Sequence, residues 1–390
     1  MLYERQDNMT EKLYDYDGYK TEFDAVVISC EKTDKGYKSE FSKTLFFPNE
    51  GGQKCDTGTV NGIEITNVEI EGDRIYHYSE TAFEVGTKVS GKIDFAERYR
   101  KMQNHTGEHI ICGIAHRLYG CENVGFHLGA DYVTMDLDKP LSCEETKKIE
   151  ILSNEAIYKN TDVTAYYPEK EELNKLVYRS KSEILENVRI VKIDGIDVCA
   201  CCAPHVRKTG EVGIIKILDR ISYKGGLRLT ISCGFDAFKD YSERLKRNIY
   251  ISNLLSVRQE EVGSAVDKLL EDISNLKNEL GRKSEIITKL YVDSIDNSDE
   301  SICLFAENLS NAEIRHIANA VKEKTPKIAA VFSGNDDSGY SYVISSKNID
   351  LKEISKEINL ALSGRGGGTS EMIQGNVLSS KKIIEKYLGL

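Results

Sequence analysis

A proline-free stretch with regularly spaced apolar residues is the feature that most restricts how this chain can fold. Residues 237–292 contain no proline. Within them, six apolar residues follow one another at spacings of 4-3-4-3-4: Val262, Val266, Leu269, Ile273, Leu276 and Leu280. This is the a/d pattern of a coiled-coil seam, so we predict a long helical connector over residues 237–292. The pattern leaves open a homodimer, an intramolecular hairpin, or a long amphipathic helix packed on its own protein.

The sequence before this connector changes character near residue 95. Residues 1–95 contain segments rich in β-branched and aromatic residues, such as EFDAVVISCE, separated by glycine-containing turns. We predict a small β-barrel-like unit there. Residues 96–236 combine a helical stretch that should end at Gly120 with strand-like segments such as RIVKI and LRLTIS.

The part after the connector, residues 293–390, alternates strand-like and helix-like segments and contains SGRGGGTSEMIQG. It predicts a compact, glycine-rich α/β domain. A chain of 390 residues is long enough for two or three domains. Because helices and strands are mixed without regular βαβ repeats, we expect the α+β class overall.

Composition narrows the class of protein. Neither a signal peptide nor a stretch of about 18 apolar residues is found, so we expect a cytoplasmic protein without a membrane partner.

The formal net charge is −11, yet residues 205–247 hold ten Lys and Arg against five Asp and Glu. A polyanion partner and an ordinary solvated face both remain open. Ten cysteines in an intracellular chain do not suggest disulfides, and their clustering indicates metal binding or chemistry.

Two short motifs supply a set of metal-binding side chains. HTGEH places His105 and His109 four residues apart on one face of a helix. VCACCAPHV contains Cys201 and His205, again four apart. Together they offer three nitrogen atoms and one sulfur atom, which is a donor set suited to one Zn²⁺ ion per chain.

Three other interpretations of these motifs remain open. HTGEH also fits the H-x-x-E-H pattern of a metalloprotease, in which Glu108 would be the general base. Cys199, Cys201 and Cys202 could be redox-active, although no C-x-x-C precedes a helix here. The zinc ion could also be purely structural, closed by the same four ligands.

The motifs resemble those of alanyl-tRNA synthetase editing domains. FFPNEGGQKCDTG (46–58) is similar to their aromatic-Pro-x-x-Gly-Gly-Gln-x-x-Asp-x-Gly signature, HTGEH to HTxxH, and CCAPHVRKTGEVGIIKI to CGGTHVxxTGxIGxFKI. SGRGGGTSEMIQG resembles the end of their C-terminal domain, which also occurs with DHH phosphoesterases. The motifs run in family order from about residue 10 to 385, as in the long form of the freestanding AlaX-type editing proteins. A class II aminoacylation domain and a P-loop are not found.

The resemblance implies a zinc-dependent hydrolase that removes serine, and possibly glycine, from mischarged tRNA(Ala), with the tRNA acceptor end as its partner. It implies that His105, His109, Cys201 and His205 hold the metal, and that Thr106 binds the serine hydroxyl. His127 would line the same cavity or be an ordinary strand histidine. Gln53 and Asp56 would shape a turn that contacts the catalytic section, and residues 96–236 would be the editing domain.

The chain departs from the family pattern where CCAPH replaces CGGTH. Cys202 stands where the family has a glycine, which adds bulk and a second thiol beside the predicted metal. Pro204 stands where the family has a threonine, so that position has neither a hydroxyl nor a backbone N–H. Cys199 is expected to be a buried strand thiol. These changes affect the detail of the pocket, and therefore the choice between serine and glycine.

Overall fold

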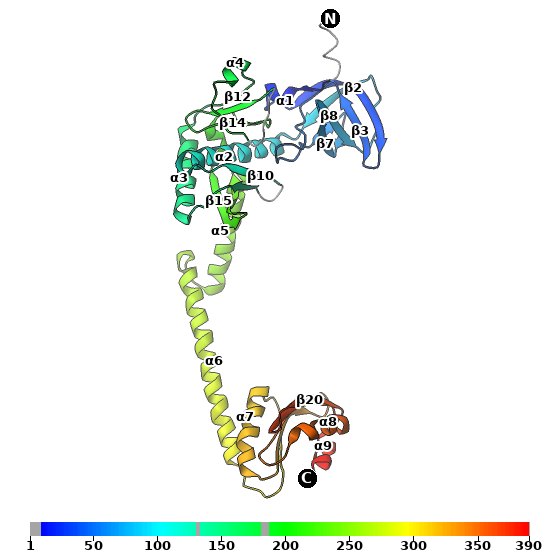
Figure 1. Ribbon diagram of the computed structural model, residues 1–390, viewed down its shortest axis with the longest axis vertical. Coiled ribbons are helices and arrows are strands. Elements are labelled where there is room, and N and C mark those ends of the chain that lie inside the picture. Colours follow the sequence, from blue (N-terminus) through cyan, green and yellow to red (C-terminus); the bar gives the residue numbers. More distant parts are fainter. Residues whose placement is uncertain (1–8, 130–132, 181–186, 390) are drawn as a thin grey trace. The chain divides into compact units, whose positions relative to one another are not determined.

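The computed structural model describes residues 9–129, 133–180 and 187–389. The chain divides into two compact units, Met1–Ile249 and Tyr250–Leu390, and Figure 1 shows the elements of each. Within the described ranges, no helix combines the length and the apolar character that crossing a membrane requires.

The first unit begins with a curled antiparallel sheet of seven strands in the order β6-β5-β9-β2-β3-β8-β7. The strands are β2 (Glu22–Thr33), β3 (Gly36–Phe41), β5 (Gly58–Val60), β6 (Ile63–Ile65), β7 (Asn67–Glu71), β8 (Arg74–Ser79) and β9 (Lys88–Ile93). The outer strands β6 and β7 are joined by the single residue Thr66, whose N–H donates to the carbonyl of Tyr78 in β8 at 2.8 Å. This link nearly closes the sheet, as the predicted barrel-like unit requires.

Short elements flank this sheet. β1 (Glu11–Lys12) pairs in parallel with β4 (Lys43–Thr44), and α1 (Leu13–Tyr16) follows β1 directly. The interior of the sheet is largely aromatic, with Phe23, Phe41, Phe46 and Phe47 all buried.

The helix α2 (Phe95–Tyr119) lies at the centre of the rest of the first unit. It begins after Asp94, whose side chain accepts the N–H of Glu97, and ends as predicted at Gly120, which has a left-handed φ of 62°. Residues 101–115 are all buried. The elements packed on α2 include α3, β10, β14 and β16. A helix covered on every side can place polar side chains in a dry interior.

These surrounding elements form two small antiparallel sheets with the orders β10-β11-β16-β15 and β12-β13-β14. Their bounds are β10 (Asn123–Leu128), β11 (Val133–Leu137), α3 (Cys143–Lys159), β12 (Val163–Tyr166), α4 (Lys170–Leu173), β13 (Ile190–Ile193), β14 (Asp197–Ala200), β15 (Ile215–Tyr223) and β16 (Gly226–Cys233). Residues 124–138 contain β10 and β11, and residues 130–132 between them lie outside the described ones. α3 begins with a capping box, in which the side chains of Ser142 and Glu145 each accept the other's backbone N–H.

The connector differs from the single long helix predicted over 237–292. The structure has two helices, α5 (Phe235–Leu255) and α6 (Val262–Asp293), separated by a short 3₁₀ turn. Ser256 ends α5 in the left-handed region with a φ of 54°. The N–H of Val257 then donates to the carbonyl of Ser252 at 3.0 Å, which is the Schellman pattern of a helix end. Because the left-handed residue is a serine and not a glycine, the sequence carries no obvious stop signal.

After α6, the second unit is an α/β sandwich. Its sheet has the order β17-β18-β19-β21-β20, and β17 and β18 are its parallel pair. Alternate residues of β18 face two separate cores, one with α7 and the other with α8 and α9. The bounds are β17 (Ile302–Ala306), α7 (Asn311–Val321), β18 (Ile328–Asn335), β19 (Gly339–Ser346), α8 (Leu351–Ala361), β20 (Gly364–Gly368), β21 (Met372–Val377) and α9 (Lys381–Leu388). This agrees with the predicted α/β module.

Candidate metal centre

Four side chains from two distant segments meet beside α2. His105 and His109 come from one face of that helix, and Cys201 and His205 come from the loop that follows β14. One donor atom from each of the four residues lies within 4.8 Å of every other. The three histidines are buried and Cys201 is nearly so. The structure therefore brings together the four residues that the sequence singled out.

The distances within this cluster fit a four-coordinate metal ion. Cys201 Sγ lies 3.5 Å from His105 Nε2 and 3.4 Å from His205 Nε2. A zinc ion with bonds of about 2.3 Å to sulfur and about 2.0–2.1 Å to nitrogen would place these atoms about 3.5 Å apart in a tetrahedron. The two sulfur–nitrogen distances thus match those expected around a shared ion.

Each histidine of the cluster has a separate hydrogen-bond partner on its other ring nitrogen. His105 Nδ1 bonds Gln53 Oε1 at 2.9 Å, His109 Nδ1 bonds Asp197 Oδ2 at 3.0 Å, and His205 Nδ1 bonds Thr106 Oγ1 at 3.0 Å. A partner on Nδ1 fixes the ring orientation and keeps Nε2 free as the ligand atom. All three Nε2 atoms are therefore prepared for coordination.

The pKa values of the adjacent thiols Cys201 and Cys202 are shifted in opposite directions. Burial opposes ionisation of Cys201, but the nearby His105 and His205 outweigh it and hold the pKa of this thiol well below its usual value. Burial raises the pKa of Cys202, and the charge of Cys201 raises it further. Cys201 is thus suited to bind a metal as thiolate, whereas Cys202 is held as a thiol against the core of the β-sheet.

Asp197 extends the site toward the surface. Its carboxylate receives two hydrogen bonds of 2.8 Å from Arg179, in addition to its bond with His109. Burial disfavours its ionised form, but His109 and Arg179 outweigh burial and lower the pKa of Asp197 to about 2. Neither residue was predicted from the sequence. Cys199 is buried in β14 as expected, and it forms a second close group with His109 and Asp197.

Thr106 and His127 occupy positions that differ from the predicted ones. Thr106 is fully buried, and its oxygen also receives the N–H of Val206 at 3.3 Å. It therefore acts on His205, and only its hydroxyl proton remains for a substrate. His127 is exposed on β10, while the neighbouring Phe126 turns its ring onto His105 with centroids 4.7 Å apart. Successive strand residues face opposite sides, so Phe126 faces the cluster, and the exposed position of His127 fits the alternative of an ordinary strand histidine.

Glu108 lies next to the cluster but is held by other groups. Asn123 Nδ2 makes a short hydrogen bond to its Oε1, and Cys112 Sγ lies 3.3 Å from the same atom. Its other oxygen is 3.7 Å from His109 Nε2. A carboxylate with these partners is poorly placed to act as the general base of a protease.

Ion pairs in the fold neutralise much of the positive charge of residues 205–247. Six of the ten cations in this segment form ion pairs with acids: Arg207, Lys208, Lys216, Arg228, Arg244 and Lys246.

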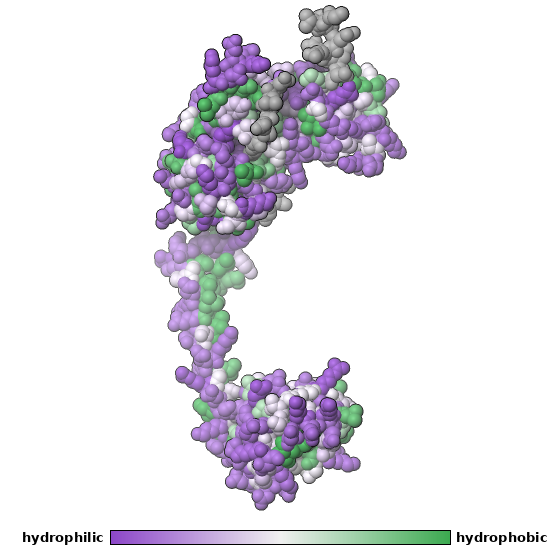
Figure 2. Space-filling view, viewed as in Figure 1, coloured by the Kyte–Doolittle hydropathy of each residue, from purple (hydrophilic) through white to green (hydrophobic). Residues whose placement is uncertain are grey.

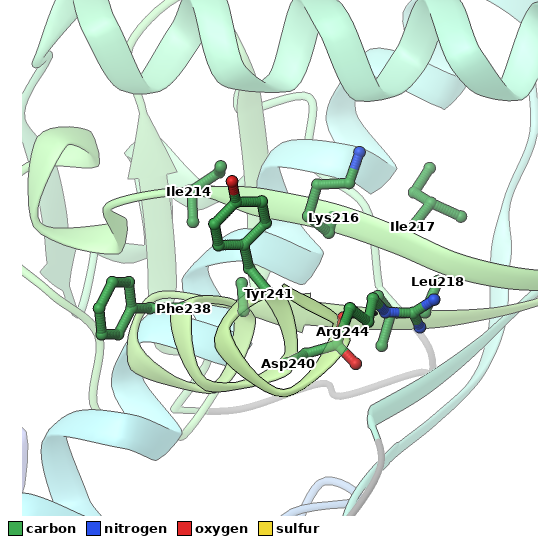
Figure 3. Close-up of a pocket in the computed structure, with 9 residues that line it drawn as sticks. Ile214, Lys216, Ile217, Leu218, Phe238, Asp240, Tyr241 and Arg244 are labelled. Atoms are coloured by element: carbon green, nitrogen blue, oxygen red, sulfur yellow. Dashed lines mark hydrogen bonds and ion pairs between the residues drawn. The ribbon is translucent and has the colours of Figure 1, made fainter. Parts of the chain in front are cut away.

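A groove of about 420 Å³ lies between the start of β15 and the first turns of α5. Figure 3 shows Phe238 and Tyr241 on one side of this groove and Ile214 on the other, with charged groups beside them. Its exposed aromatic rings are a second candidate surface for a nucleic acid.

Comparison with known proteins gives two domain matches and several relatives that align over nearly the whole chain. Residues 188–229 match the family described as the threonyl and alanyl tRNA synthetase second additional domain, and residues 299–385 match the DHHA1 domain. The chain is 26% identical to the alanyl-tRNA editing protein AlaX-L of Pyrococcus horikoshii, over 95% of both chains. It is 25% identical to the alanyl-tRNA editing protein Aarsd1 of Danio rerio, over 95% of this chain and 94% of that protein.

The chain also resembles part of a larger enzyme. It is 28% identical to the alanine–tRNA ligase of Pyrococcus abyssi over 98% of this chain, but spans only 44% of the ligase. Over nearly its whole length the chain is therefore similar to the AlaX-type alanyl-tRNA editing proteins, and its two domain matches and the order of its motifs agree with this similarity.

Proposed function

We propose that this protein hydrolyses mischarged tRNA(Ala), chiefly Ser-tRNA(Ala), and that its activity depends on zinc. The observation that carries this proposal is the cluster of His105, His109, Cys201 and His205 within 4.8 Å, in a chain that aligns over 95% of its length with a protein named for alanyl-tRNA editing. The proposed reaction adds water to the carbonyl carbon of the aminoacyl ester. The ester C–O bond then breaks, the ribose oxygen takes up one proton of the water, and the amino acid leaves as its carboxylate while the other proton is released to solvent.

Side chains around the cluster would prepare this reaction by holding the three histidine rings in a fixed orientation. Gln53, Asp197 and Thr106 hold the three imidazole rings so that their Nε2 atoms converge. A zinc ion held there would supply positive charge next to the reacting ester. The buried surroundings would strengthen each hydrogen bond to the substrate, because water no longer competes for it.

Selectivity for serine would depend on a polar partner for its hydroxyl. A site built to bond a hydroxyl can reject the analogue lacking it by about 10⁴–10⁵ in the best cases. Thr106 could serve only as a donor, since its oxygen already meets His205 and Val206. Glycine has no hydroxyl, so its removal would need a separate explanation.

We also propose that two copies of the chain pair through α6. Its seam residues Leu269, Ile273 and Leu276 are exposed, and Figure 2 shows apolar surface along this helix. The buried residues of α6, Thr288 and Val292, are not part of the heptad seam. An apolar seam left uncovered within one chain suits a second copy of itself.

The test is to incubate the purified protein with Ser-, Gly- and Ala-tRNA(Ala), with and without a chelator. We expect release of serine, little release of alanine, loss of activity with the chelator and recovery with zinc. Cys201→Ser should lose bound zinc, whereas the matched variant Cys202→Ser should keep it. Intact seryl ester after incubation with zinc-loaded protein would refute the proposal. Binding of tRNA without any hydrolysis would favour the alternative of a non-catalytic, zinc-stabilised tRNA-binding module.

A further inference from the structure

Gln53 carries a buried hydrogen-bond donor that the fold does not use. The residue is 3% exposed, and its Oε1 accepts from His105 Nδ1 at 2.9 Å. Its Nε2 is buried, and over residues 9–129, 133–180 and 187–389 no acceptor lies within hydrogen-bonding distance. Buried amide groups nearly always find partners, so an unfilled one beside a reaction centre suggests a missing ligand.

The orientation of this amide follows from the metal centre. When His105 Nε2 serves as the ligand atom, its Nδ1 carries the proton and must donate. The amide oxygen of Gln53 therefore faces His105, and the amide nitrogen, on the same carbon beside the cluster, is left without a partner in the described part of the chain. The N–H groups of Nε2 can only donate, so the missing ligand is an oxygen or another acceptor.

The backbone around Gln53 holds this arrangement firmly. The N–H of Gln53 donates to the carbonyl of Glu50 at 3.0 Å, and the N–H of Leu128 donates to the carbonyl of Gly52 at 2.8 Å. Gly52 has a φ of 82°, and a Cβ there would lie 2.2 Å from the carbonyl oxygen of Phe126. The backbone of the turn is thus held closely against β10, which fixes the point from which the Gln53 side chain reaches His105.

We propose that Gln53 Nε2 donates a hydrogen bond to the carbonyl oxygen of the aminoacyl ester. This inference rests on the proposed function and adds a catalytic residue to it. When water adds to the carbonyl carbon, the π electron pair of the C=O bond moves onto this oxygen, and the donor then meets a full negative charge. The pair returns when the ester C–O bond breaks and the ribose oxygen takes a proton. A donor aimed at that oxygen favours the transition state over the ground state.

Two variants test the donor. Gln53→Glu keeps an oxygen for His105 but removes the donor, and Gln53→Met removes it without adding charge. Lys54→Gln, at the exposed next position of the same turn, is the control. For both Gln53 variants we expect kcat to fall by about 10²–10³, equally for the seryl and the glycyl ester. The control should retain its rate.

The measurements must separate a lost donor from a weakened metal centre. Zinc content and circular dichroism are recorded for each variant, and rates are compared at saturating zinc. A fall in kcat of less than about threefold in Gln53→Glu overturns the inference. A fall in kcat for the seryl ester alone also overturns the inference. The donor would then bond the hydroxyl of the serine side chain and not the carbonyl oxygen that both esters share.

A binding experiment keeps this inference separate from the proposed function. The probe is 3′-seryl-amino-adenosine, in which an amide replaces the ester but the carbonyl oxygen remains. Calorimetry should show binding to the wild type that weakens about tenfold in Gln53→Met. If the wild type binds the probe but hydrolyses no ester, the proposed function fails while the donor stands. Equal affinity in both proteins overturns the donor.

Discussion

The ion pair between Arg98 and Asp56 ties the β-sheet of the first unit to α2. Both side chains are fully buried. Arg98 Nε lies 3.1 and 3.0 Å from the two oxygens of Asp56, and its Nη1 donates to the carbonyl of Gly18 at 3.0 Å. Asp56 also accepts the N–H of Phe47 at 2.7 Å. Two charges so well satisfied are tolerated in a dry interior, but neither is tolerated alone.

Removing one partner should therefore destabilise the first unit strongly. We expect Arg98→Met to lower the free energy of unfolding by about 3–5 kcal/mol, because Asp56 is then buried without its cation. Urea unfolding followed by circular dichroism measures this loss. Lys92→Met, which breaks the exposed pair with Glu22, is the control and should change little. A comparable loss in both variants would contradict the argument.

His77 should make the first unit sensitive to acid. Its ring is buried against Phe41 and Phe46, and its Nε2 bonds Thr44 Oγ1 at 2.8 Å. Burial lowers the pKa of His77 from 6.5 to about 3. Between these two pH values the unfolded chain binds a proton that the folded chain does not, so stability falls as the pH falls below 6.5.

The size of this effect can be measured against a variant. From pH 7 to pH 5, the wild type should lose about 1–2 kcal/mol more unfolding free energy than His77→Gln. Above pH 7.5 the two proteins should show parallel pH dependence. Equal slopes between pH 7 and pH 5 would show that His77 is not the responsible group.

Single residues also show what the sequence could and could not predict about the site. The cluster of His105, His109, Cys201 and His205 was predictable, because i and i+4 positions of a helix share a face and C-x-x-x-H repeats that spacing. Thr106 is one step further round the helix, so its hydroxyl faces the loop of His205 and not open space. The partners Gln53 and Asp197 come from distant segments, and only the tertiary fold brings them to the histidines.

At the scale of elements, the apolar seam of α6 predicts how two chains would pair. With Val266, Ile273 and Leu280 as a positions, Leu269 and Leu276 fall at d positions. Two of the three a positions, Val266 and Ile273, are β-branched, and β-branched residues at a with leucine at d favour a parallel two-stranded coiled coil. In that arrangement Asp272 at g faces Lys277 at e of the other chain, which is an attractive pair.

A charge placed in this seam should separate the two chains. We expect Leu276→Asp to convert a dimer into single chains, because the buried seam cannot accept a carboxylate. The control is Asn275→Asp, which adds the same side chain one position away at an outward-facing c position. Sedimentation equilibrium gives the mass of each. A wild type with the mass of one chain would remove pairing through α6.

The break between α5 and α6 shows the limit of the heptad pattern. The seam was predicted correctly as helical from residue 262 onward, because six apolar positions define it. The residues before it were joined to the same helix because no proline or glycine separates them. A serine in the left-handed region at position 256 ends α5 through backbone hydrogen bonds alone, and composition does not reveal such an end.

At the scale of the whole molecule, the predicted metal concerns only one of the two units. His105, His109, Cys201 and His205 all lie within Met1–Ile249. The second unit has its own sheet and two apolar cores. An ion bound only by the folded first unit stabilises that unit by mass action, and the second should not respond.

Calorimetry of the full chain should therefore show two transitions, of which a chelator moves one. We expect EDTA to lower the transition of the first unit by about 10 °C, since a ligand at about a thousand times its Kd adds about 4 kcal/mol and each kcal/mol shifts a unit of this size by about 2–4 °C. The transition that Arg98→Met lowers identifies the first unit, and this should be the same one that EDTA moves. The second transition should stay in place with either treatment. If both transitions moved together under EDTA, the two units would unfold as one cooperative body, and the metal would stabilise the whole chain.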